Sequence, residues 1–187
     1  MAYILASKSP RRHAYLTELG IPFTVLTRET DESLAEGITP RQGVEILARR
    51  KAEALTDAVA PTDVVIAADT LVELDGRALG KPIDEADAKA MLKRLSGSRH
   101  TVHTGVAVKK GDTLLSDGET TVIRFRPLSE REIDAYIASG EPMDKAGAYG
   151  IQGGASAFVE SIEGEFDNVV GLPCKTLVRL LREIEKC

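Results

Sequence analysis

The sequence predicts an α/β fold in which helices flank a mixed central sheet, built as one domain over residues 1–187. Three observations favour this fold. The chain has 187 residues with 43% hydrophobic composition, which is enough for one core and too little to argue for two. Short apolar runs alternate with amphipathic segments along the chain. Runs separated by short turns in the middle of the chain indicate paired strands.

The first third of the chain predicts strands and helices in alternation. The expected elements are a strand at 3–6, a helix at 10–19, a strand at 23–26, a helix at 40–55 and a strand at 63–68. Ser9-Pro10 and Thr39-Pro40 each offer an N-cap followed by proline in the first helical turn. The run at 63–68 is continuously apolar, as in a strand buried on both faces, so Asp69 is expected at its carboxyl end.

The remainder predicts a hairpin turn at Asp75-Gly76 and further helices and strands. These are a helix opened by Asp84 and ending at 96–97, strands at 102–108 and 121–125, a helix from Ser129 to about 140, a strand at 158–162 and a helix from 173. Residues 144–154 are too glycine-rich for a regular element. We expect a shaped loop over a ligand there.

Composition excludes several classes of protein. The net charge of −5 argues against a nucleic-acid binder working through a basic surface. No stretch approaches the roughly 18 apolar residues of a membrane span, and no secretory signal opens the chain. We therefore expect a cytoplasmic protein with no membrane partner. Cys174 and Cys187 are expected to be reduced thiols.

The segment Ser7-Lys8-Ser9-Pro10-Arg11-Arg12 resembles a phosphate cradle. It joins hydroxyl groups, free backbone N–H groups and two guanidinium groups where a strand leads into a helix. An ordinary N-cap with two solvated arginines explains the same residues equally well. Arg49 and Arg50 are expected on a solvated helix face. Neither a Walker A loop nor a dinucleotide fingerprint occurs, since 147–154 lacks the flanking strand and helix.

Asp69 is the first candidate for catalysis. A carboxylate after a buried strand lies where α/β enzymes place functional groups, although capping of a turn is the commoner role of such a residue. Glu32 is a second carboxylate for Mg²⁺ or Mn²⁺, since hard cations prefer oxygen ligands. Lys81 and Lys145 suit a triphosphate, although loop lysines are more often solvated.

The three histidines and Cys174 are weaker candidates. His100 and His103 would face opposite sides of a strand, so a shared metal site is not expected and structural roles are favoured. Cys174 begins the last helix, where the helix N-terminus could lower its pKa, but a small core thiol is the preferred interpretation.

The order of the motifs resembles the Maf family from the first strand to the last helix. The residues that carry the resemblance are Leu5 to Arg12, Ala68-Asp69-Thr70, Leu79-Gly80-Lys81-Pro82, Leu95-Ser96-Gly97, His103 to Val106, Asp144 to Gly153 and Val169 to Pro173. The resemblance implies nucleoside triphosphate pyrophosphatase activity. It also implies an elongated domain similar to the inosine triphosphate pyrophosphatases, with a deep nucleotide cleft.

By the same resemblance, Asp69 activates water and Glu32 helps to hold the divalent metal. The residues expected to line the phosphate path are Ser9, Arg12, Lys51, Lys81 and Lys145. Arg12, Thr70 and Gln152 resemble the branch that hydrolyses dTTP and UTP, and the Gln152 amide offers a donor and an acceptor to the uracil edge. Similar proteins are often homodimers.

Two alternatives stay open. The same chemistry could act on 7-methyl-GTP or another non-canonical nucleotide. A non-catalytic nucleotide-binding regulator of cell division would use the same cleft without turnover.

Overall fold

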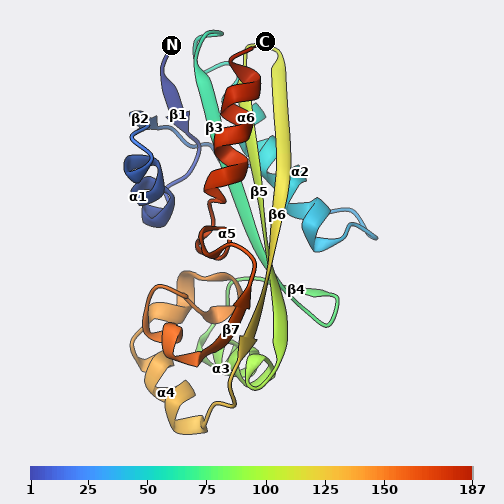
Figure 1. The fold of residues 1–187 in the computed structure, drawn as a ribbon. Helices are drawn as coiled ribbons and strands as arrows, with labels where there is room; N and C mark the ends of the chain where they lie inside the picture. Colours follow the sequence, from blue (N-terminus) through green and yellow to red (C-terminus); the bar gives the residue numbers. More distant parts are fainter. Residues whose placement is uncertain (187) are drawn as a thin grey trace.

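One sheet runs the length of an elongated molecule in the computed structural model, which describes residues 1–186 (Figure 1). Its strands are β1 (Tyr3–Leu5), β2 (Phe23–Val25), β3 (Val64–Leu74), β4 (Arg77–Leu79), β5 (Arg99–Lys110), β6 (Thr113–Phe125) and β7 (Val159–Glu163). The α-helices are α1 (Pro10–Glu18), α2 (Pro40–Glu53), α3 (Glu85–Leu95), α4 (Glu130–Ala138), α5 (Phe166–Val170) and α6 (Cys174–Ile184). Three short 3-10 helices are η1 (Glu141–Asp144), η2 (Ala146–Ala148) and η3 (Gly154–Phe158).

The sheet is mixed, as the sequence predicted. The strand order is β2-β1-β3-β5-β6-β7, with β4 paired to β3. Strand β1 is parallel to β2 and β3, whereas β3, β5, β6 and β7 are joined by antiparallel pairing. The long strands β3, β5 and β6 twist as they pass from one end of the molecule to the other (Figure 1).

Alternate residues of β3 pack against different helices at the end of the molecule that carries both termini (Figure 1). Val65 and Ala67 pack on the side of α2, with Ala48, Ala52 and Leu55. The side chains of Val64, Ile66 and Ala68 pack on the other face, together with Leu16 of α1 and Leu177, Leu180 and Ile184 of α6. Helix α6 therefore buries an apolar stripe of Leu177, Leu180 and Ile184 against the sheet.

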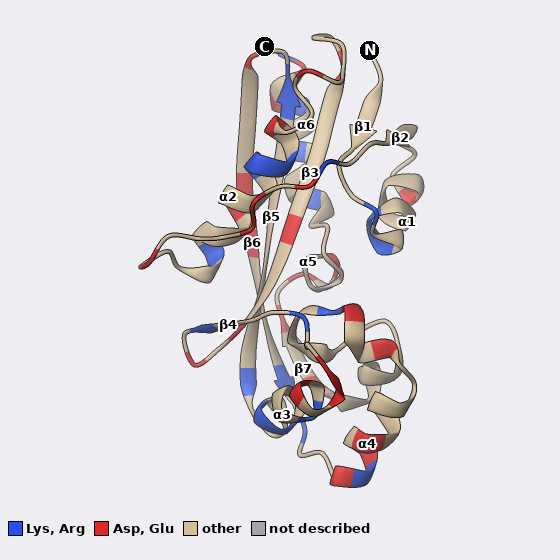
Figure 2. Ribbon diagram, turned by 180° about the vertical axis from the view of Figure 1, so that it is seen from behind, with Lys and Arg blue, Asp and Glu red and all other residues tan. Residues whose placement is uncertain are grey.

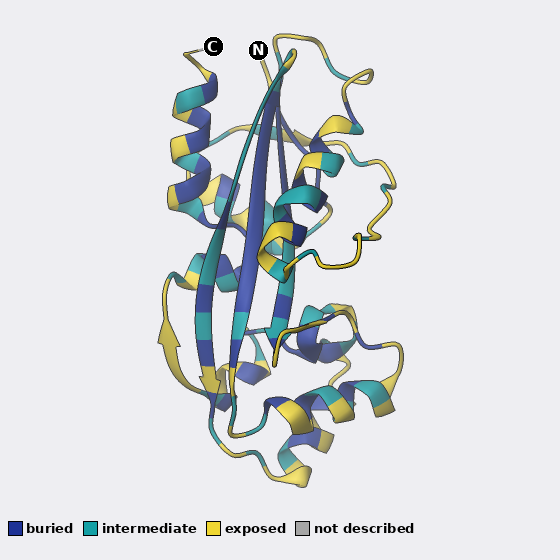
Figure 3. Cartoon of the chain, turned by 90° about the vertical axis from the view of Figure 1, so that its right-hand side faces the viewer, coloured by how far each residue is buried: buried dark blue, intermediate teal, exposed yellow. Residues whose placement is uncertain are grey.

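A second core fills the opposite end of the molecule. It joins the far ends of the same long strands to α3, α4 and the 3-10 helices, through residues such as Val72, Leu92, Phe125, Tyr149 and Phe158. Figure 3 shows that the strands in the middle of the molecule are buried, while the helices present exposed residues outward. The cores at both ends are thus built on one set of strands.

Strand β3 is longer than the sequence predicted. It continues to Leu74, so Asp69 lies in the middle of the strand and not at its carboxyl end. The polar pair Asp69-Thr70 does not end the strand because β5 pairs with β3 from Val64 through Glu73. Helix α5 was not predicted, since five residues are too few for a clear periodicity.

The opposite edge of β3 is open around Asp69. Strand β1 pairs with β3 as far as Ile66, and β4 pairs with it from Val72 onward. Between these positions no strand of residues 1–186 covers that edge. Backbone groups and side chains from both faces of β3 can therefore reach a ligand there.

In the described part of the chain, no helix has the length and apolar character needed to cross a membrane.

Candidate active site

Asp69, Lys51 and Glu32 form a charged cluster on the α2 face of the sheet. The Lys51 ammonium contacts the Asp69 carboxylate directly and lies 2.9 Å from Glu32 Oε1. Asp69 and Lys51 are largely buried, whereas the Glu32 side chain is 65% exposed. The hydrogen bond and charge of Lys51 hold the pKa of the Glu32 carboxyl below its usual range, and the charge of Lys81 adds to this shift. The Lys51 ammonium thus lies between the two carboxylates as their shared cation.

Lys51 reaches Asp69 because of its place on α2. It follows Leu47 and Ala48 by four and three residues, so it lies on the buried stripe of the helix. Two glycines that face each other across β5 and β6, Gly105 and Gly118, let α2 approach the sheet. A Cβ atom at Gly105 would overlap the Val44 carbonyl group, and one at Gly118 would lie 3.1 Å from Glu45 Oε1. The glycine pair thus determines the distance between the sheet and α2, the helix that carries Lys51.

Arg50 holds the loop that carries Glu32. Its guanidinium donates hydrogen bonds to the main-chain oxygens of Asp31, at 3.0 Å, and Ser33, at 2.6 Å. These contacts of Arg50 are exposed, and the prediction of a solvated helix face did not include them. Because Arg50 and Lys51 are neighbours in α2, one helical turn fixes both the Glu32 loop and the cation beside it. Arg49 donates to Ser116 Oγ at 3.2 Å.

Arg12 and Thr70 form a second polar group. The Arg12 guanidinium donates to Gly171 O at 2.8 Å, Ser7 Oγ at 3.1 Å and Thr70 Oγ1 at 3.2 Å. Thr70 Oγ1 lies 2.9 Å from Thr104 Oγ1, which donates to a backbone oxygen of α5. Burial lowers the pKa of Arg12, and the charge of Asp69 opposes that shift. The sequence analysis placed Ser7 in the candidate phosphate cradle and Thr104 in a family motif, but it did not predict these contacts.

The two groups lie on opposite faces of the sheet because Asp69 and Thr70 are consecutive in β3. Asp69 faces α2 with Lys51, and Thr70 faces α1 with Arg12. Figure 2 shows basic stretches of α1 and α2 on either side of the acidic band in β3. Both groups are carried by the part of β3 whose edge is covered by no strand of residues 1–186.

The other predicted site residues lie in separate segments of the chain. Ser9 is the N-cap of α1, but within residues 1–186 its side chain makes no capping hydrogen bond. Lys81 is exposed in the loop after β4. Lys145 Nζ donates to Glu141 O at 2.8 Å and Asp144 Oδ1 at 2.6 Å. Gln152 is exposed in the glycine-rich segment.

The glycine-rich segment packs beside the Lys81 loop, since Gly147 N donates to Gly80 O at 3.0 Å. The pKa of Asp144 is lowered, first by its hydrogen bond with Lys145 and further by the charge of Arg11. The glycine-rich segment therefore interacts through the charge of Asp144 with Arg11, in the first turn of α1. It contains the short helix η2 and overlaps the end of η1 and the start of η3, none of which the prediction of an irregular loop included.

The histidines have side-chain partners, as expected for structural roles. His100 Nε2 lies 2.8 Å from the Tyr149 hydroxyl, and burial lowers its pKa to about 4. His103 lies between Glu73 and Thr120, at 2.8 and 3.0 Å. The two rings have different surroundings, as expected for positions that face opposite sides of a strand.

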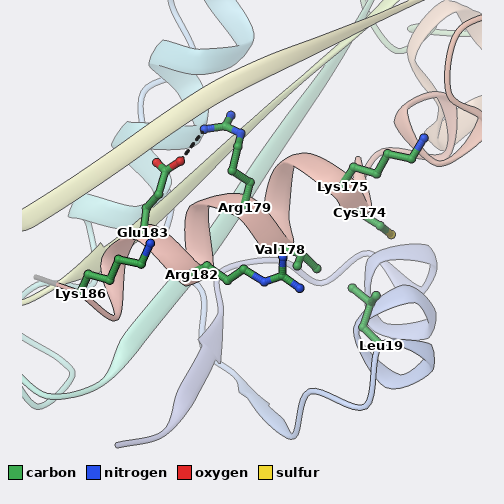
Figure 4. Close-up of a pocket in the computed structure, with 8 residues that line it drawn as sticks. All are labelled: Leu19, Cys174, Lys175, Val178, Arg179, Arg182, Glu183 and Lys186. Carbon is green, nitrogen blue, oxygen red and sulfur yellow. Dashed lines mark hydrogen bonds and ion pairs between the residues drawn. The ribbon is translucent and has the colours of Figure 1, made fainter.

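Cys174 lies at a separate depression of about 560 Å³ between α1 and α6 (Figure 4). Leu19 and Val178 line it together with basic side chains of α6, and it contains none of the predicted site residues. Burial, followed by a hydrogen bond with Asp167, raises the pKa of the Cys174 thiol to about 12. The helix N-terminus therefore does not activate this thiol. Cys187 lies outside the described residues.

Comparison with known proteins gives concordant matches. The Maf-like protein family matches residues 2–184. The dTTP/UTP pyrophosphatase of Symbiobacterium thermophilum is 52% identical over 180 residues, which cover 96% of this chain and 92% of that protein. The dTTP/UTP pyrophosphatase of Pelotomaculum thermopropionicum is 47% identical over 182 residues, which cover 96% and 95%.

A solved structure shows the same fold. A HAM1 protein from Coxiella burnetii superposes with a TM-score of 0.50 at 16% identity, over 98% of this chain and 100% of that one. At this level of identity the likeness concerns the fold alone.

Proposed function

The chain belongs to the Maf family, and from this membership we propose that it hydrolyses dTTP and UTP to the nucleoside monophosphate and pyrophosphate. One observation carries the proposal: relatives that are about half identical over nearly the whole chain are named dTTP/UTP pyrophosphatase. The charged cluster of Asp69, Lys51 and Glu32 at an open strand edge supports it, because such a cluster suits the transfer of a phosphoryl group to water.

The residues fit a divalent metal. The carboxylates of Glu32 and Asp69 already converge on one cation, the Lys51 ammonium, and both offer the oxygen atoms that Mg²⁺ and Mn²⁺ prefer. Within residues 1–186 no group of three or more His, Cys, Asp or Glu side chains could hold a metal. A magnesium-type site needs only one or two carboxylates, because water and substrate phosphates complete the coordination. When bound, the metal would neutralise phosphate charge and polarise the α-phosphate.

Asp69 is the proposed general base. It accepts a proton from a water molecule while the water oxygen bonds to the α-phosphorus, and the bond from the α-phosphorus to the bridging oxygen breaks, releasing pyrophosphate. The Lys51 ammonium contacts the Asp69 carboxylate directly, so a cation lies beside the proposed general base. Positioning and charge stabilisation supply most of the rate in such reactions.

Several elements supply the proposed contacts to the phosphates and to the nucleotide base. Ser9 and Arg12 at the start of α1, Lys51 on α2, and Lys81 and Lys145 in the loops are the proposed phosphate ligands. The uncapped N-terminus of α1 suits an anion, since its backbone N–H groups carry partial positive charge. Arg12, Thr70 and Gln152 are proposed to determine the pyrimidine specificity.

The test is pyrophosphate release from dTTP, UTP, CTP, ATP, GTP, ITP and 7-methyl-GTP, each with Mg²⁺, with Mn²⁺ and with chelator. We expect metal-dependent release confined mainly to dTTP and UTP. Turnover of a purine nucleotide instead would retain the reaction and overturn the specificity. Binding without turnover of any nucleotide would overturn the enzyme in favour of a nucleotide-binding regulator.

We further propose a homodimer in the cytoplasm. The resemblance to the family supports the homodimer, and the nucleotide substrate supports the compartment. Light scattering coupled to size-exclusion chromatography should give about twice the 20.1 kDa mass of the chain. A mass of one chain across the working concentration range would contradict the dimer.

A further inference from the structure

Gln152 lies at the tip of a tight turn. Gly153 N donates to Gly150 O at 3.0 Å, which closes a four-residue turn over Gly150–Gly153. Ile151 is 6% exposed and belongs to the core at this end of the molecule, whereas Gln152 points to solvent. Buried Ile151 therefore anchors the turn, and the amide side chain of Gln152 projects from it.

The carboxylate of Glu141 lies inside the base of this turn. Its Oε2 accepts a hydrogen bond from Gly154 N at 3.0 Å, and its Oε1 accepts one from the Tyr136 hydroxyl at 3.1 Å. Cβ atoms at Gly150 and Gly153 would overlap this carboxylate. Glycine at these positions therefore leaves room for the Glu141 carboxylate inside the turn.

Tyr136 completes the contact from the other side. Its hydroxyl accepts a hydrogen bond from Gly150 N at 2.9 Å while donating to Glu141, so the hydroxyl and carboxylate together bind both ends of the turn. The Tyr136 ring is 6% exposed, packs edge-on against Phe158, and lies on α4, which is a regular helix. Burial, opposed by the Gly150 contact and aided by the charge of Glu141, raises the pKa of Tyr136, so it stays a hydrogen-bond donor.

We infer that Glu141 and Tyr136 are positioning residues for recognition of the pyrimidine base, acting through Gln152. This inference rests on the proposed function. The pair ties the Gln152 turn to α4, so the amide keeps one orientation toward the uracil edge before the nucleotide binds. A side chain held in advance loses less conformational freedom on binding, and so discriminates more strongly between bases.

Glu141→Gln is the first variant, because it preserves size but replaces one acceptor oxygen with a donor. Losing a hydrogen bond to a charged acceptor is expected to raise KM for UTP about tenfold, while kcat changes less than about threefold. The preference for UTP over CTP, as a ratio of kcat/KM, should fall by a similar factor. Tyr136→Phe removes the other contact and should act in the same direction. Glu130→Gln, an exposed change on α4 away from the turn, is the matched control.

A double-mutant cycle with Gln152→Ala decides whether Glu141 acts through Gln152. We expect Gln152→Ala to reduce the preference for UTP over CTP, and Glu141→Gln to cause no further loss in that background. A further loss by the full factor would overturn the inference, and so would an unchanged preference in either single variant. Thermal unfolding of each variant identifies any that fails to fold, in which case Tyr136→Phe replaces Glu141→Gln in the cycle.

The same cycle in dissociation constants separates this inference from the proposed function. Binding of UTP and CTP is measured by calorimetry with chelator present. If the wild-type protein binds UTP selectively but releases no pyrophosphate with metal, the proposed reaction fails. The cycle still tests whether Glu141 acts through Gln152. If neither nucleotide binds, the inference is overturned together with the base specificity.

Discussion

At the scale of single residues, the site depends on neighbours in β3 that face opposite sides of the sheet. Asp69 faces Lys51 and Thr70 faces Arg12. One strand therefore supplies both the proposed general base and one of the residues proposed to recognise the pyrimidine. The second carboxylate on β3 has a different partner. Glu73, four residues further along the same face, pairs with His103 at 2.8 Å.

This difference predicts the outcome of substituting the two carboxylates. Asp69→Asn should lower pyrophosphate release at least about a hundredfold, because an amide cannot accept the proton from water. The variant should remain folded, since Lys51 keeps Glu32 as a partner. Glu73→Gln should retain activity within a few-fold. Full activity of Asp69→Asn, with folding confirmed by circular dichroism, would remove Asp69 from its proposed role.

His100 predicts a pH dependence of stability. Burial lowers its folded-state pKa to about 4, while an unfolded histidine titrates near about 6.5. Between these values the unfolded chain binds more protons, so the free energy of unfolding must fall as the pH falls. The contribution is about 2 kcal/mol between pH 8 and pH 5.

Urea unfolding at pH 8, 6 and 5 measures this effect as the difference between wild type and His100→Gln. The variant should lose less stability on acidification, although it starts from a lower value at pH 8. Parallel curves for the two proteins would show that His100 does not titrate as described.

The sequence predicted the members of the site better than their arrangement. Asp69 was expected at the end of a strand, since two polar residues after an apolar run usually mark such an end. Its charge is accommodated in mid-strand by Lys51, which is 18 residues away in sequence. Glu141 and Tyr136 gave no signal at all, because their role depends on glycines that fold around them.

At the scale of elements, two similar helix starts differ in structure. Thr39-Pro40 forms a full capping box with Gln42, whereas Ser9-Pro10 forms no side-chain cap within the described chain. The sequence predicted both helices and their starts correctly, because proline and the hydroxyl residue define the first turn. It could not distinguish the capped end from the open one. That depends on the third helical residue, which is Gln42 in α2 and Arg12 in α1.

The packing of α2 predicts unequal effects for two glycines on the same rung of the sheet. Gly105→Ala should cost about 1–3 kcal/mol or more, because the new methyl group meets the backbone of α2 at Val44. It should also reduce activity, since lifting α2 moves Lys51 away from Asp69. Gly118→Ala should cost less, because it meets only the flexible side chain of Glu45.

Chemical denaturation and pyrophosphate release of the two glycine variants test this order. The opposite order, or an equally active Gly105→Ala, would show that the height of α2 does not determine the geometry of the site.

At the scale of the whole molecule, the two ends share their strands. Strand β3 contributes Ile66 and Ala68 to the core beneath α6, and Val72 and Leu74 to the core beside α3. Strand β5 does the same with Val106 and Val102. Because continuous strands cross the site, the Gln152 turn at one end is fixed relative to Asp69 in the middle.

This continuity predicts one cooperative unfolding transition for the whole chain. Leu92→Ala at one end and Leu177→Ala at the other each remove a fully buried side chain and should each cost about 2–5 kcal/mol. Both should lower the temperature of the same calorimetric transition, with equal calorimetric and van't Hoff enthalpies. Hydrogen exchange in α3 and α6 should rise together in either variant. If Leu92→Ala instead exposed α3 alone, the ends would unfold separately, and the turn that carries Gln152 could move independently of Asp69.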